Sequence, residues 1–109
     1  MSSYNKGLNP NFQNKAGNTL AILAIENNLP QLAHLIVNDP RFDPNKQNKI
    51  GDTAAMTAFI FKQPSTADII SKNPLFNPHL VNRVGLTTGT YGIHHGFDDS
   101  FRLIIEHPL

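Results

Sequence analysis

A six-residue pattern returns at a fixed interval of 34 residues and limits the architectures that this chain can adopt. The stretch 14–19 reads Asn-Lys-Ala-Gly-Asn-Thr, and related stretches follow at 48–53 and 82–87. An Asx-Pro turn precedes each copy at the same spacing, at Asn9-Pro10, Asp43-Pro44 and Asn77-Pro78. Three copies in one register predict a stack of similar supersecondary units rather than one irregular core.

Each unit is predicted to contain two helices joined by a short turn. The repeated glycine can adopt positive φ in a tight turn, and the threonine two residues later can cap a helix N-terminus. First helices are therefore expected at about 18–27, 52–61 and 86–94. Second helices are expected to begin near Pro30 and Pro64, where proline suits the first turn, and near Asp98 in the third unit. Their apolar faces are expected to include Leu35.

A Gly-x-Thr turn that opens an alanine-rich helix, followed by a second helix and Asp-Pro-Asn, resembles the ankyrin repeat family. The resemblance covers roughly residues 8–109. It implies an all-α, ankyrin-like solenoid of three degenerate helix-turn-helix repeats with Asx-Pro and glycine turns. A lead-in over 1–12 would precede an array over 13–109, divided at about 13–46 (unit 1), 47–80 (unit 2) and 81–109 (unit 3). The tetratricopeptide repeat has a similar period, but its Trp/Leu-Gly/Tyr pattern is absent.

The Thr-Pro-Leu-His tetrad of that family is degenerate in every unit. No copy keeps the histidine, since the tetrads begin at Thr19, Thr53 and Thr87 and end in Ile22, Met56 and Thr90. We therefore expect the hydrogen bonds that usually tie one loop to the next to be lost, which would lower stability. Unit 3 is the most degenerate, because its first helix carries two glycines and neighbouring threonines, which are poor helix formers.

Composition excludes several classes of function. Lysine and arginine number 9 against 8 aspartates and glutamates, a balance that argues against binding nucleic acid through its phosphates. Cysteine is absent, and no apolar run reaches the ~20 residues that span a bilayer. His94 and His95 are adjacent and lack the i, i+4 spacing of a zinc pair, and Asp98-Asp99 fits a helix start. We expect no enzyme, no catalytic residue, no cofactor, no metal, and neither nucleic acid nor membrane as partner.

The resemblance implies recognition of a protein partner through a concave face made of loop tips and first helices. Lys15, Lys49 and Arg83 would form a row of cations, either as a solvated edge or as a contact for acidic side chains. An apolar set would either pack between units or form the centre of a binding site; it consists of Ile50, Val84, Leu86, Ile60 and Phe61. The expected partner-binding residues are Lys15, Asn18, Glu26, Asn27, Lys49, Ile50, Asp52, Ile60, Phe61, Arg83, Val84, Leu86, His94 and His95.

These expectations describe an interaction module or adaptor located in the cytoplasm. The Asp-Pro-Asn turns look like those of repeats in effectors of intracellular pathogens, so delivery into a host cytosol is part of the expectation. The alternative is a targeting or regulatory fragment of a larger multidomain protein whose catalytic part lies outside this chain. The apolar segment 101–105 would leave the array uncapped, which favours a fragment, a homodimer through that end, or a short array near the three-unit minimum.

Overall fold

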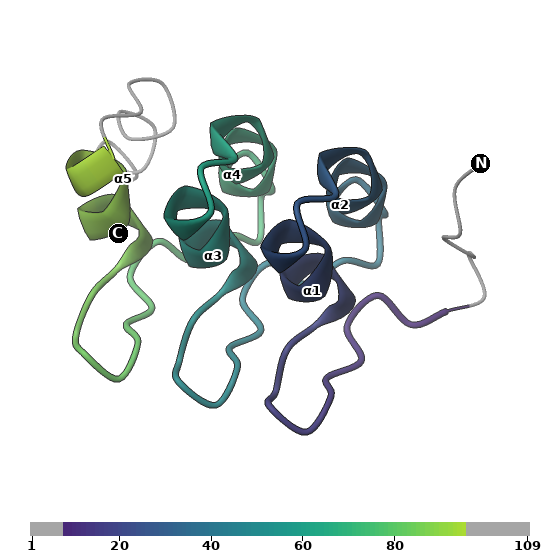
Figure 1. Ribbon diagram of the computed structural model, residues 1–109, viewed down its shortest axis with the longest axis horizontal. Coiled ribbons are helices and arrows are strands. Elements are labelled where there is room, and N and C mark those ends of the chain that lie inside the picture. The colour runs from purple at the N-terminus through teal and green to yellow at the C-terminus, as the bar shows by residue number, and fades with distance from the viewer. Residues whose placement is uncertain (1–7, 96–109) are drawn as a thin grey trace.

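The computed structural model describes residues 8–95, which form five helices. α1 (Leu20–Glu26) pairs with α2 (Pro30–Val37), and α3 (Ala54–Ile60) pairs with α4 (Pro64–Ser71). α5 (Thr88–His95) is the first helix of unit 3, whose second helix was expected beyond the described residues. In Figure 1, α1, α3 and α5 lie in one row and α2 and α4 in a second, with three long loops on the side away from the second row.

The expected all-α solenoid is confirmed for the described part of the chain, where the β-structure amounts to an isolated bridge between Gln13 and Thr19. Among the helices of residues 8–95, none is long and apolar enough to cross a membrane.

Threonine caps and proline starts set the bounds of the helices. The Thr19 hydroxyl accepts a hydrogen bond from the Ile22 N–H at 3.3 Å, and Thr53 caps α3 in the same way. Because threonine is the N-cap, α1 and α3 begin two residues later than the expected positions 18 and 52. Pro30 and Pro64 are the first residues of α2 and α4, as expected.

The core is thin and lies between the two rows of helices. Ala21 of α1 and Ala58 of α3 are fully buried, so the first helices of neighbouring units can approach closely. Phe59 is the largest fully buried side chain, and Ile36 is buried on α2. Leu35, expected on the buried face of α2, is instead exposed, because no earlier unit within the described residues covers that side of the helix.

Glutamine amides take over the linkage between loops that was expected to be lost. The Gln13 Nε2 group donates to the carbonyl of Gly17 in its own loop and to that of Gln47 in the next, both at 2.9 Å. Gln47 repeats this arrangement with Gly51 and Val81, again at 2.9 Å for both bonds. An amide has two hydrogens, so one side chain both closes its loop and reaches its neighbour. The expectation of lost bonds between loops is therefore wrong.

Asparagine side chains add two further sets of bonds between neighbouring loops. In the first set, Asn48 Nδ2 donates to Asn18 Oδ1 at 2.8 Å, and Asn82 Nδ2 donates to Asp52 Oδ1 at 2.9 Å. The second set is made by two asparagines of the Asx-Pro turns. Asn11 donates through Nδ2 to the Arg41 carbonyl at 2.8 Å and accepts through Oδ1 from the Asp43 N–H at 2.7 Å. Asn45 does the same one unit later, donating to the Leu75 carbonyl at 2.7 Å and accepting from the Asn77 N–H at 2.8 Å.

Candidate partner-binding surface

The tips of the three loops are held in one row by backbone hydrogen bonds. The Lys49 N–H donates to the Ala16 carbonyl at 3.0 Å, and the Arg83 N–H donates to the Ile50 carbonyl at 2.9 Å. Each tip therefore offers a cation followed by an apolar residue, and the loops that carry these pairs lie side by side (Figure 1). We call this the tip row, which consists of Lys15, Ala16, Lys49, Ile50, Arg83 and Val84.

The side chains of the tip row are accessible for contact with a partner in the described part of the chain. Lys15, Lys49 and Arg83 are exposed, and none is in an ion pair within residues 8–95. Ile50 is 58% exposed and Val84 is 74% exposed. Exposed β-branched apolar side chains side by side, bordered by cations, form a surface that burial against a partner would stabilise.

The predicted residues that follow the repeated glycine lie at the junctions between loops. Asn18 and Asp52 each accept the amide of an asparagine in the next loop, and Asp52 is only 8% exposed. Leu86 holds the same position in unit 3 and is half-buried. The structure thus places Asn18 and Asp52 in positions that couple units, and the Oδ1 atom of each already has a protein donor.

The predicted residues at the ends of the first helices lie apart from the tips. Glu26 and Asn27 are exposed at the end of α1, and Phe61 is exposed beside half-buried Ile60 at the end of α3. The seven residues of α3 span about 10 Å at the rise of an α-helix. Because the tip comes before α3 and Phe61 comes after it, the predicted apolar set is divided between the two ends of that helix.

His94 and His95 end α5, and their side chains lie outside what the structure describes. The apolar segment 101–105, predicted as an open end and a dimer interface, also lies outside the described residues.

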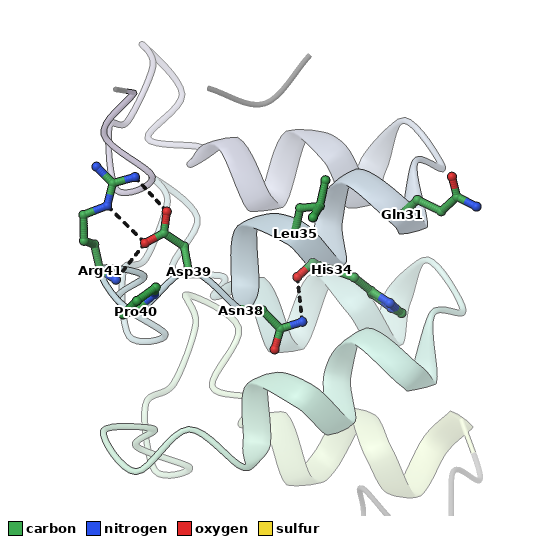
Figure 2. A pocket seen from close by; sticks show the side chains of 7 residues that line it. All are labelled: Gln31, His34, Leu35, Asn38, Asp39, Pro40 and Arg41. Carbon is green, nitrogen blue, oxygen red and sulfur yellow. Dashed lines mark hydrogen bonds and ion pairs between the residues drawn. The ribbon is translucent and has the colours of Figure 1, made fainter. Parts of the chain in front are cut away.

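A hollow of about 920 Å³ lies over α2 and the turn that follows it, away from the tip row. Figure 2 shows its lining, in which Asp39 accepts from Arg41 through both carboxylate oxygens, with an Nη2–Oδ2 distance of 2.7 Å. The Nε2 atom of His34 is buried and has no hydrogen-bond partner among the described residues. The hollow is lined by Gln31, His34, Leu35, Asn38, Asp39, Pro40 and Arg41.

The hollow has a single carboxylate, that of Asp39, among its lining residues. Its one carboxylate is engaged by the guanidinium of Arg41. In residues 8–95, no group of three or more histidine, aspartate or glutamate side chains is arranged to hold a metal ion. None of the predicted partner-binding residues lines it.

Comparison with known proteins finds a similar structure but no similar sequence. No family model matches the sequence, and no curated protein matches it either. The structure is similar to the crystal structure of EF0377, an ankyrin repeat protein, with a TM-score of 0.69 and 20% sequence identity. The match covers 90% of this chain and 51% of that one, so this chain spans about half the length of EF0377. The chain therefore has the ankyrin-repeat fold, as the residue pattern predicted.

Proposed function

We propose that the chain is a protein–protein interaction module that binds its partner along the tip row and the adjoining first helices. The observation that carries this proposal is the backbone coupling of the tips, because the bonds of Lys49 and Arg83 fix three cation–apolar pairs relative to one another. A surface that is already ordered loses less conformational entropy on binding than a flexible one. The ankyrin-repeat fold supports the same class of function by analogy.

The residues of the tip row favour a partner surface that is acidic and partly apolar. Carboxylates would face the three cations, and apolar side chains would cover Ile50 and Val84. Charges at the edge of an interface act mainly on association rate and partner choice, and salt screens them beyond about 8 Å at physiological ionic strength. Binding is therefore expected to weaken as salt is raised.

A matched pair of charge reversals tests this proposal. Proteins retained by the immobilised chain would be identified, and the Kd of each would be measured for the native chain, Lys49→Glu and Lys46→Glu. Both lysines are exposed and lie in the same loop, but only Lys49 belongs to the tip row. We expect Lys49→Glu to weaken binding of a true partner about tenfold, which corresponds to roughly 1.4 kcal/mol, and Lys46→Glu to change it less than twofold.

Two outcomes would contradict the proposal. Equal losses in both variants would indicate general electrostatic attraction to the cations of this loop rather than recognition by the tips. Unchanged affinity in both would place the partner elsewhere on the molecule. Far-UV circular dichroism of each variant checks that the array still folds.

A further inference from the structure

The face of unit 1 that points away from unit 2 has the same hydrogen-bonding groups that unit 2 uses to receive unit 1. On unit 2, the Lys49 N–H, the Gln47 carbonyl and the Asn48 Nδ2 group all bond to unit 1. On unit 3, the equivalent groups of Val81, Asn82 and Arg83 bond to unit 2 in the same way.

Unit 1 presents the same set 34 residues earlier, at Gln13, Asn14 and Lys15, and the Asn9 N–H corresponds to that of Asp43, which bonds to Asn11. None of the four unit 1 groups bonds to another unit within residues 8–95.

The same face of unit 1 is apolar and hollow. A recess of about 370 Å³ lies between α1 and the preceding loop. Phe12 is 70% exposed there, and Leu8 is exposed beside it. On unit 2, the residue equivalent to Leu8 is Phe42, and it is buried. The recess is lined by Leu8, Asn9, Phe12, Asn14, Asn18, Leu20 and Leu23.

The second helix of unit 1 shows the same contrast. Leu35 on α2 is exposed, whereas its equivalent on α4, Ile69, packs against the core. Leu32 is half-buried, whereas its equivalent, Thr66, is fully buried. Apolar side chains of unit 1 are thus more exposed at the positions that unit 1 itself covers on unit 2.

We propose that this face of unit 1 is a receiving face for one further two-helix unit, whose loop carries glutamine and asparagine at the positions of Gln13 and Asn18. The residues that unit 1 contributes to its interface with unit 2 indicate which residues the occupant needs, because units 1 and 2 present the same receiving groups. One unit takes 34 residues, so neither residues 1–7 nor residues 96–109 are long enough to form it. The occupant therefore comes from another stretch of polypeptide.

A second copy of this chain is a poor occupant when stacked head to tail. Its units 1 and 2 already donate to their own neighbours. Its unit 3 carries Val81 and Leu86 where units 1 and 2 carry glutamine and Asn18 or Asp52. Valine and leucine side chains have no hydrogen-bonding group, so such a copy would leave the Gln13 carbonyl and the Asn14 amide unpaired.

The test is an extended chain in which residues 1–41 are followed directly by residues 8–109, so that one extra unit precedes unit 1 in register. Stability in a stacked array is the sum of unit and interface contributions, so a coupled unit raises the unfolding temperature. We expect a rise of at least about 5 °C over the 109-residue chain. We also expect at least tenfold slower hydrogen exchange of the amide that corresponds to Lys15 in the second copy.

The matched control is the same extended chain with Gln13→Val and Asn18→Leu in the inserted copy, which gives it the residues of unit 3. We expect the control to lose at least half of the gain in unfolding temperature. An extended chain that melts at the temperature of the 109-residue chain, or whose Lys15 amide exchanges as before, would overturn the proposal. Equal gains in both extended chains would also overturn it, because the polar groups would then contribute nothing.

Discussion

The loops of units 2 and 3 have the same backbone design but differ in what they offer to a neighbour. Both are closed from within by an asparagine side chain, and both have a glycine at positive φ. The Gln47 side chain of unit 2 donates to the next loop, whereas the side chain of Val81, in the same position of unit 3, has no donor. Asp52 accepts an amide from unit 3, whereas Leu86 has an apolar side chain at that position.

Loop shape and loop coupling are therefore encoded by separate residues. Shape comes from asparagine and glycine within one loop, and it survives in unit 3. Coupling comes from positions such as Gln47, whose side chain reaches a carbonyl in the next unit. A unit can therefore keep its fold while it loses the means to bind a following unit.

The largest expected effect comes from the repeated glycine. At Gly51, φ is +85°, and a Cβ atom would lie 2.7 Å from Asn82 Cα in the next loop. At Gly85, φ is +84°, and a Cβ atom would meet nothing within 4 Å. The left-handed conformation costs an L-residue about 1–2 kcal/mol, and a clash with backbone adds about 1–3 kcal/mol. We expect Gly51→Ala to destabilise by roughly 2–5 kcal/mol and Gly85→Ala by roughly 1–2 kcal/mol.

Denaturant unfolding followed by circular dichroism measures both changes. The glycine pair isolates the close approach of the loops, because both positions share the same φ. Equal losses of unfolding free energy in the two variants would show that the loops of units 2 and 3 do not come this close in solution. Gly17, whose Cβ would lie 2.9 Å from Asn48 Cα, should behave like Gly51.

A smaller loss is expected from Gln47→Val, which gives unit 2 the residue that unit 3 has. The variant removes two hydrogen bonds of 2.9 Å, to the carbonyls of Gly51 and Val81. Because both bonds are partly exposed to water, each contributes about 0.5–1.5 kcal/mol, and a total loss of about 1–2 kcal/mol is expected. Gln47→Glu is the informative companion, since it keeps the shape of the side chain but has no amide hydrogen. A native unfolding midpoint for Gln47→Val would mean that the amides do not couple the loops.

Residues whose structural effect is confined to neighbouring positions in the sequence were predictable. The capping threonines, the prolines that start α2 and α4, and the glycines with positive φ each act on their own turn. Their 34-residue register was enough to predict the stack.

The bonds that the Gln13 and Gln47 amides make to the next loop were not predicted, because each of them joins residues of different units. Gln13 bonds to a carbonyl 34 positions away, and backbone carbonyls carry no signature in a sequence. The signal that could have revealed it is the recurrence of glutamine at 13 and 47, and of asparagine at 11 and 45, in the same register as the glycines. The same reasoning would have marked Asn18 and Asp52 as coupling residues as well as surface residues.

The candidate surface was predictable in part. The tips were identified because they recur, and the structure holds Lys49 and Arg83 in line. The apolar set was predicted as one patch but is divided, because Ile50 comes before α3 and Phe61 follows it, and a sequence does not show how far apart the helix holds them. Phe61 and Ile50 therefore need separate tests.

The smallest expected effect is that of Val81→Gln, which gives unit 3 the coupling residue of unit 2. The new amide could donate to the Gly85 carbonyl in its own loop, as Gln47 does to Gly51. Its second hydrogen would have no carbonyl of a following unit within the described residues, and the position is 52% exposed. Surface changes of this kind are usually within about 0.5 kcal/mol of neutral. A gain above about 1 kcal/mol in denaturant unfolding would exceed what one exposed hydrogen bond provides. Such a gain would show that unit 3 does have a neighbour for its loop, and unit 3 could no longer be treated as the last unit in the series of coupled loops.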